Sequence, residues 1–222
     1  AFAAIKNDGT VVTWGAGVHG GNSSVVSDKL SGVTAIYASD SAFAALKSDG
    51  SVVTWGWGTN DFAQNRGGDS SAVADKLSSG VVEVFSVSSA FAALKSDGSV
   101  VTWGSEDWGG DSSSVSDQLS GGVETIASSD SAFAALKSDG SVITWGNEDW
   151  GGDSSSVSGQ LSGGVEAIFS SGAAFAAIKA DGSVVTWGSD AHGADSSRVS
   201  SLLASDVNEI FSTYWAFTAL KQ

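Results

Sequence analysis

The chain of 222 residues contains no cysteine, which excludes several kinds of chemistry at once. Without a thiol there is no disulfide bond, no thiolate nucleophile and no cysteine-bound zinc. Basic side chains are also scarce: 10 lysines and arginines stand against 25 aspartates and glutamates, for a formal net charge of −15. Because nucleic acids and anionic membrane surfaces are bound through clustered Lys and Arg, we do not expect nucleic acid as a partner.

Long apolar runs and methionine are missing too. No stretch approaches the roughly 18 residues that a membrane helix needs, so we expect no membrane insertion. No basic segment followed by an apolar one opens the chain. With no Met at all, the chain is expected to be a mature product or a segment of a longer protein. The hydrophobic residues that are present, 41% of the total, are enough to form a core.

The most prominent feature of the sequence is one segment that is repeated five times. The segment is "SAFAALKSDGSVVTWG" at 41–56, and close variants begin at Ala1, Ala90, Ala132 and Ala174. Six phenylalanines mark the period, at spacings of 41, 48, 42, 42 and 42 residues: Phe2, Phe43, Phe91, Phe133, Phe175 and Phe217. A period of this length is typical of propeller blades and of helical-pair solenoids.

Each repeat predicts three short strands. The first is an apolar segment with β-branched residues, such as Val123 and Ile126. The second and third are "AFAALK" and "SVVTWG", which alternate with period two and are joined by an Asp-Gly pair that favours a tight hairpin turn. After each Trp-Gly, apolar residues four positions apart, such as Val115 and Leu119, predict a helical turn capped by Asp111 or a following serine.

Hairpins this short cannot bury their apolar faces alone, so the repeats must stack on one another. We predict an all-β fold, a five-bladed β-propeller of short three-stranded blades with a helical turn on each; the alternative is an open repeat array. A single propeller domain is expected over 1–222. Its predicted units are 1–41, 42–89, 90–131, 132–173 and 174–215, with 216–222 as a partial sixth unit.

The two ends of the chain carry the same strand. The strand expected over 207–212 could pair with the hairpin of residues 2–14 and close a ring of five. In that case "AFAAIK" at 1–6 and "AFTALK" at 216–221 would occupy the same position, so one strand is surplus. Residues 216–221 would then start a further array, be displaced, or pair with another chain in an open stack. Self-association through residues 216–222 follows from the last of these arrangements.

The segment "VETIASSDSAFAALKSDGSVITWG" at 123–146 resembles the repeat of the regulator-of-chromosome-condensation family, whose members are β-propellers. The likeness extends over all five units. The sequence departs from the family in three ways: Ala-Phe replaces the His or Ser before the Leu-containing strand, the Gly-Gln-Leu-Gly segment after Trp-Gly is missing, and the unit is shorter. The resemblance implies a propeller fold more than it implies a function. Nucleotide exchange on a small GTPase, a role of some family members, is carried as a further alternative.

One position differs between units while the frame around it is constant. Three residues before the capping Asp or Asn, each unit has a flat side chain that can stack or hydrogen-bond: His19, Arg66, Trp108, Trp150 and His192. On a ring of blades these residues would share one rim, and indole faces beside acids are suited to binding sugars. We predict a ligand-binding rim for a glycan or protein ligand. The alternative is that each residue only covers the blade beneath it.

Acidic residues near the same rim suggest calcium as a candidate cofactor, because carboxylate oxygens are the ligands that Ca²⁺ prefers. The candidate ligands are Glu106, Asp107, Asp111, Glu148, Asp149 and Asp153. Their spacing matches neither an EF-hand nor the Gly-rich nonapeptide calcium repeat. The alternative is that Asp111 and Asp153 cap helical turns and that the other acids are solvated.

Other recurring residues are interpreted as structural. The tryptophan that ends each third strand is assigned to blade packing: Trp14, Trp55, Trp103, Trp145 and Trp187. A lysine two residues before each turn aspartate, such as Lys47 before Asp49, predicts an exposed ion pair of small energy. Tyr214 and Trp215 replace small or polar residues of the other units, and we expect them to cover an end or to dock a partner.

No enzyme activity is expected. The two histidines, His19 and His192, occupy equivalent places in separate units, and a serine needs a positioned base to become a nucleophile. We therefore expect a non-enzymatic binding or scaffold module with an extracellular or cell-surface location. Carbohydrate binding at the rim is the first hypothesis. A structural spacer or self-assembly repeat of a large surface protein is the alternative.

Overall fold

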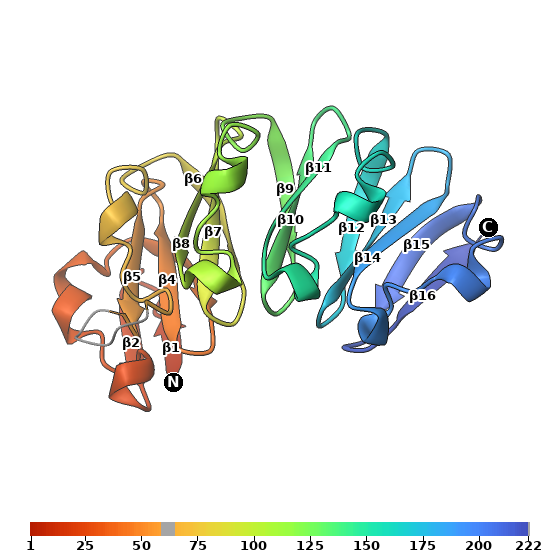
Figure 1. Ribbon diagram of the computed structural model, residues 1–222. Helices are drawn as coiled ribbons and strands as arrows, with labels where there is room; N and C mark the ends of the chain where they lie inside the picture. The colour runs from red at the N-terminus through yellow and green to blue at the C-terminus, as the bar shows by residue number, and fades with distance from the viewer. Residues whose placement is uncertain (59–64, 222) are drawn as a thin grey trace. The chain divides into compact units, whose positions relative to one another are not determined.

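The computed structural model describes residues 1–58 and 65–221. The chain divides into two compact units, Ala1–Ser113 and Ser114–Gln222, and each is built from small antiparallel sheets joined by short turns (Figure 1). Every helix in the described part of the chain is a 3-10 turn, and none has the length and apolar character needed to cross a membrane.

Unit 1 contains a two-stranded sheet and two three-stranded sheets. Its strands are β1 (Phe2–Ile5) and β2 (Val11–Trp14); β3 (Val33–Ala38), β4 (Ala42–Lys47) and β5 (Val52–Gly56); β6 (Val81–Ser86), β7 (Ala90–Lys95) and β8 (Val100–Gly104). Its 3-10 turns are η1 (Gly17–His19), η2 (Ser24–Lys29), η3 (Ser71–Val73) and η4 (Glu106–Trp108).

Unit 2 repeats the pattern and ends on a two-stranded sheet. Its strands are β9 (Val123–Ser128), β10 (Ala132–Lys137) and β11 (Val142–Gly146); β12 (Val165–Ser170), β13 (Ala174–Lys179) and β14 (Val184–Gly188); β15 (Val207–Ser212) and β16 (Phe217–Lys221). The 3-10 turns are η5 (Ser113–Val115) at its start, then η6 (Glu148–Trp150), η7 (Ser155–Val157), η8 (Asp190–His192) and η9 (Ser197–Val199).

The repeated three-stranded antiparallel sheets confirm the predicted mostly-β repeat architecture. Each complete sheet takes its first strand from the end of one predicted unit and its hairpin from the start of the next. In unit 2, β15 pairs with β16, and in unit 1, β1 pairs with β2. The five-bladed ring stays a prediction.

The hairpin turns form as the Asp-Gly pairs predict. In the β10–β11 turn, Gly140 has a φ of +76°, a conformation that glycine adopts without steric cost. Asp139 Oδ1 accepts hydrogen bonds from the backbone N–H of Ser141 at 2.9 Å and from its hydroxyl at 2.6 Å. These bonds stabilise the turn through residues of the turn itself.

Neighbouring sheets within a unit meet at one recurring contact. Phe175 and Trp187 stack at 5.3 Å between ring centroids, and the Trp187 Nε1–H donates to the carbonyl of Gly151 in the preceding turn at 3.2 Å. A Cβ at Gly151 would lie 2.6 Å from the Phe175 ring. We call this arrangement the Phe–Trp–Gly contact. Its equivalents in unit 1 are Phe43, Trp55 and Gly20, and Phe91, Trp103 and Gly67.

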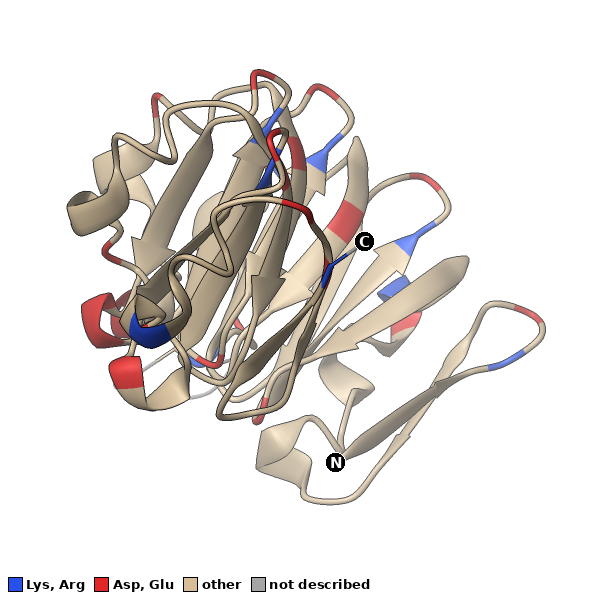
Figure 2. Cartoon of the chain, turned by 90° about the vertical axis from the view of Figure 1, so that its right-hand side faces the viewer, with Lys and Arg blue, Asp and Glu red and all other residues tan. Residues whose placement is uncertain are grey.

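The lysines of the hairpins behave in two ways. Lys6 and Lys47 form the predicted ion pairs, with Asp8 at 3.7 Å and Asp49 at 3.4 Å. In later hairpins the ammonium group donates instead to a carbonyl oxygen 19 residues earlier: Lys95 to Lys76, Lys137 to Gln118, Lys179 to Gln160, and Lys221 to Leu202. Figure 2 shows basic residues at strand ends and acidic residues in the adjoining turns.

The predicted helical turns are short 3-10 turns. In η7 the backbone N–H of Leu161 reaches the carbonyl of Val157 at 3.2 Å, as their spacing predicts. The N-cap residue is Ser154, whose side chain makes no capping bond. Asp153 Oδ1 accepts the N–H of Ser155 at 2.8 Å, so the carboxylate satisfies a first-turn donor from one position before the cap.

Gly151→Ala should destabilise unit 2 by about 3 kcal/mol, because the new methyl group meets the Phe175 ring and a non-glycine residue must adopt a φ of +97°. Urea unfolding followed by circular dichroism measures this. Gly159→Ala is the matched control, since nothing lies within 4 Å of its added Cβ, and it should change the free energy of unfolding by less than about 0.5 kcal/mol. Equal effects of the two substitutions would contradict the packing role of Gly151.

The turn aspartates predict a loss of stability in acid. Hydrogen bonds from the Ser51 side chain and backbone hold the pKa of Asp49 at about 2. Equivalent bonds lower the pKa of the other turn carboxylates, Asp8, Asp97, Asp139 and Asp181. A carboxylate whose pKa is lowered by folding stabilises the folded state above its ordinary pKa near 4, and this stabilisation is lost as the pH falls toward 2.

Thermal melts at about pH 7, 4 and 2.5 should therefore show a fall in Tm concentrated in the lower interval. Asp49→Asn keeps an oxygen acceptor for Ser51 but cannot ionise, so the variant should show a shallower fall. A Tm that is constant between the two lower pH values would contradict the role of these carboxylates.

Candidate ligand-binding rim

Four of the five predicted rim residues lie at the ends of 3-10 turns, and the fifth, Arg66, lies outside any 3-10 turn. His19 ends η1, Trp108 ends η4, Trp150 ends η6 and His192 ends η8. The sequence did not predict these turns. The sequence signal that could have predicted them is the glycine that follows each of these rim residues. In the structure these glycines have a positive φ, between +87° and +104°: Gly20, Gly109, Gly151 and Gly193. Because this glycine reverses the chain, the side chain before it is held at the end of its turn.

In unit 1 the structure brings two rim residues to Trp57, which the sequence analysis missed. The His19 ring lies 5.1 Å from the Trp57 ring, between centroids, and the Arg66 Cζ lies 5.0 Å from the Trp57 centroid, in cation–π range. His19 Nδ1 is 3.2 Å from Ser41 Oγ. Trp57 lies in the irregular second unit of the repeat, outside the shared frame. Trp108 is half-buried at the end of η4.

In unit 2 three aromatic rings meet around His192. The His192 ring stacks on Trp215 at 4.5 Å, and it contacts Tyr214 edge-on at 5.6 Å and Trp150 at 5.9 Å, all between centroids. Tyr214 and Trp215 contact each other edge-on at 4.8 Å. We call these residues the His192 cluster. Two of them, Trp150 and His192, were predicted as rim residues, and Tyr214 and Trp215 were predicted to cover an end or to dock a partner.

His192 is held from three sides and is 9% exposed. Its Nδ1 lies 3.0 Å from Ser189 Oγ, and its backbone carbonyl accepts a hydrogen bond from the Ser171 hydroxyl at 2.8 Å. Its Nε2 is buried and has no hydrogen-bond partner among the described residues. Buried side-chain nitrogens are normally hydrogen-bonded, so the unpartnered Nε2 is an unusual feature of this cluster.

Tyr214 is fixed by residues of the neighbouring sheets. Its hydroxyl donates to Asp130 Oδ2 at 2.7 Å, and its carbonyl accepts the N–H of Gly172 at 2.9 Å. A Cβ at Gly172 would lie 2.7 Å from the Tyr214 ring, so this position requires a glycine. The hydrogen bond to Asp130 raises the pKa of Tyr214, with smaller contributions from desolvation and from the charge of Asp130.

The predicted calcium ligands do not gather into a site. Among the residues that the structure describes, no three His, Asp or Glu side chains lie close enough to hold a metal ion. Glu106, Asp107, Glu148 and Asp149 are exposed in the first turns of η4 and η6. Asp111 and Asp153 accept the N–H groups of Ser113 and Ser155. Calcium binding stays a prediction.

The recurring tryptophans occupy two environments. Four of them are buried, with exposed fractions between 1% and 4%: Trp55, Trp103, Trp145 and Trp187. Trp14, in the two-stranded sheet β1–β2, is 50% exposed and stacks on Phe2, which is 64% exposed. The tryptophan at this repeat position is therefore buried in the complete sheets, whereas on the β1–β2 hairpin it forms an exposed apolar surface together with Phe2.

No family model matches the chain, and no curated protein matches it. Solved structures do. Prp20p from Saccharomyces cerevisiae, studied for its binding to Gsp1p and histones, is 16% identical with a TM-score of 0.53, over 98% of this chain and 62% of that one. The CRINKLY WD40 ectodomain of the Arabidopsis thaliana receptor kinase ACR4 is 17% identical with a TM-score of 0.50, over 83% of this chain and 66% of that one.

The chain therefore spans less than two thirds of each of these structures. Identities this low show a shared fold alone. With the repeated three-stranded sheets, the matches assign the chain to propeller-like repeat folds.

The bond between Tyr214 and Asp130 can be measured directly, because the chain has only two tyrosines. In a Tyr37→Phe background, Tyr214 should ionise above its ordinary pKa of about 10. Adding Asp130→Ala removes the acceptor and its charge, so the pKa should return toward about 10. Phenolate absorbance as a function of pH measures both values. An unchanged midpoint in the double variant would contradict this geometry.

Proposed function

We propose that the chain is a non-enzymatic binding module whose His192 cluster binds carbohydrate. The observation that carries the proposal is the Trp215 indole, which is 62% exposed and is backed by the His192 ring at 4.5 Å. A flat indole held in a fixed orientation offers C–H contacts to one face of a sugar ring, and the supporting imidazole prevents it from swinging away.

Polar groups of the same cluster supply the hydrogen bonds that a sugar needs. Asp130 Oδ2 already holds the Tyr214 hydroxyl, and a carboxylate oxygen can accept more than one donor. The Tyr214 side chain is 46% exposed, so its hydroxyl oxygen can also take part in hydrogen bonds to a ligand. A saccharide stacked on Trp215 would therefore have acceptor and donor groups beside it. This combination of a flat apolar face with a few placed polar atoms is typical of small-ligand sites.

The corresponding residues of unit 1 support a ligand less well. The Trp57 ring is contacted by both His19 and Arg66, and the Trp57 Nε1 is buried. Its apolar surface is thus already used within the protein. The proposal therefore rests on unit 2 and leaves the unit 1 residues in the covering role that the sequence analysis gave as the alternative.

An extracellular or cell-surface location and membership of the regulator-of-chromosome-condensation family are parts of the same proposal. The first is supported by the Cys-free, Ser-rich, Gly-rich and acidic composition, and the second by the repeat at 123–146. A propeller-like fold is compatible with both, because such folds carry binding surfaces of many kinds.

A glycan array with the purified chain, run in calcium and again in chelator, tests the proposed site. Trp215→Ala should weaken binding about tenfold or more, because it removes the stacking face. Phe211→Ala is the matched control: Phe211 is 54% exposed on β15 but lies outside the His192 cluster, so its removal should leave binding unchanged.

The absence of any bound glycan, or equal binding by wild type and Trp215→Ala, would contradict the proposal. Binding lost only in chelator would support the predicted calcium at the acidic turns. Binding lost equally in both single variants would indicate general damage to the end of unit 2, and circular dichroism of each variant separates that case from loss of the site.

A further inference from the structure

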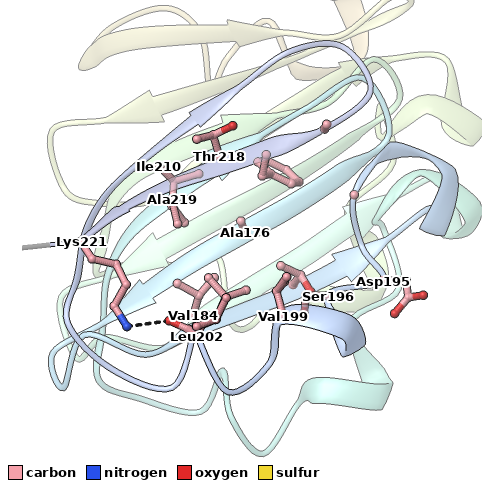
Figure 3. A pocket seen from close by; sticks show the side chains of 15 residues that line it. Ala176, Val184, Asp195, Ser196, Val199, Leu202, Ile210, Thr218, Ala219 and Lys221 are labelled. Atoms are coloured by element: carbon pink, nitrogen blue, oxygen red, sulfur yellow. Dashed lines mark hydrogen bonds between the residues drawn. The ribbon is translucent and has the colours of Figure 1, made fainter.

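A groove of about 540 Å³ lies beside β16 at the end of unit 2 (Figure 3). In the two-stranded sheet β15–β16, only one edge of β16 is paired. The groove is lined mainly by apolar side chains, which are Val184, Val199, Leu202, Leu203, Ile210 and Ala219. Lys221 and Asp195 lie at its margins. Lys221 donates to the carbonyl of Leu202 across one end.

In a complete sheet this position belongs to the third strand. In the sheet β12–β13–β14, Val185 and Trp187 of β14 are buried among residues of the preceding repeat, including Leu161 and Val165. The Trp187 Nε1–H donates to Gly151. The equivalents of Leu161, Val165 and Gly151 at the end of the unit are Leu203, Val207 and Gly193, and the first and last of these line the groove.

At Gly193 the phenylalanine and the glycine of the Phe–Trp–Gly contact are present, but the tryptophan is not. A Cβ at Gly193 would lie 2.7 Å from the Phe217 ring, so Phe217 occupies the place that Phe175 has in the preceding sheet. Among the described residues of unit 2, no tryptophan contacts Gly193 in the way that Trp187 contacts Gly151. The groove therefore continues the sheet-to-sheet interface of the repeats, but lacks the strand that carries the indole.

The hairpin β1–β2 has the missing side chains. Residues 1–15 and 174–188 differ only at the positions of Asn7 and Thr10. Phe2 lies opposite Trp14 in the hairpin, and their rings stack at 5.4 Å, as in the complete sheets. Phe2, Val12 and Trp14 are 64%, 49% and 50% exposed. The hairpin thus carries a second and a third strand, and among the described residues no first strand pairs with it.

We propose that the hairpin β1–β2 of a second copy of this chain exchanges for β16 beside β15. The incoming β1 takes the register of β16, with Phe2 opposite Ser212 and its ring over Gly193. The incoming β2 fills the groove, with Val12 against Leu203 and with the Trp14 Nε1–H donating to the Gly193 carbonyl. The result is a complete three-stranded sheet made from two copies.

The exchange is favourable because the two competing strands are nearly the same. "AFAAIK" at 1–6 replaces "AFTALK" at 216–221, so the backbone pairing to β15 is conserved. The gain is the third strand, which buries exposed apolar groups of both copies. Each copy has a net charge of −15, so repulsion opposes association at low ionic strength. Since donor and acceptor are different surfaces, the contact is head-to-tail and extends to rings or filaments.

Sedimentation velocity at rising protein and salt concentration gives the first test, with oligomers expected to increase with both. Trp14→Ala should abolish them, whereas Val25→Ala, which also truncates an exposed side chain of unit 1, should not. Deletion of residues 216–222 should increase association, because β16 no longer competes for β15. A monomer at all concentrations, or oligomers that the deletion abolishes or that persist in Trp14→Ala, overturns the proposal.

Disulfide trapping tests the register and does not depend on how the deletion folds. Phe211 lies opposite Thr218 in β15–β16, so the exchange places Ala3 of the second copy there. In a cysteine-free chain, Phe211→Cys mixed with Ala3→Cys should give a mixed disulfide dimer on oxidation, because facing strand residues have the required spacing. Phe211→Cys mixed with Val25→Cys is the control. Equal yields of mixed dimer in the two mixtures overturn the exchange. Neither test involves a carbohydrate, so its outcome is separate from that of the glycan array.

Discussion

The Phe–Trp–Gly contact is the interaction on which the rest of each unit depends. A sheet with small alanines on its middle strand has little apolar surface of its own, and the stacked Phe and Trp supply most of what it can bury. The indole N–H must also find an acceptor once it is buried. Both needs are met by one glycine, whose missing side chain admits the Phe175 ring and whose carbonyl accepts the Trp187 donor. The Phe–Trp–Gly contact recurs from sheet to sheet, so each unit is held together by repeated small contacts.

The same glycine links packing to the candidate binding rim. Four of the five rim side chains directly precede such a glycine at the end of a 3-10 turn, so the conformation that lets the next sheet approach also fixes the direction of the side chain. His192 shows the consequence, since Gly193 lies against Phe217 while the imidazole supports Trp215. Substitution of a rim residue changes the surface, whereas substitution of the glycine changes the fold. Variation at the rim within a constant frame follows from this separation.

Local signals in the sequence predicted the strands and hairpins, because Asp-Gly turns and alternating apolar residues act within a few residues. The stacking of Trp215 on His192 could not be predicted in the same way, since these residues are brought together only when the last sheet packs on the preceding turn. Trp57 lies outside the repeating frame, so comparison between units gave it no role. The ion-pair rule failed at Lys137 for a related reason: the carbonyl of Gln118 is supplied by a distant loop that the rule does not consider.

Repetition has a further physical consequence at incomplete sheets. When every repeat carries the same complementary surfaces, the hairpin of one copy fits the exposed groove of another copy. The repeats themselves therefore do not prevent association between copies, and a different interaction must oppose it. Here the opposing term is the charge of −15, which acts on every pair of copies and is weakened by salt. The acidic composition, which at first only argued against nucleic acid as a partner, therefore also sets the ionic strength at which the exposed Trp14 of one copy can meet Gly193 of another.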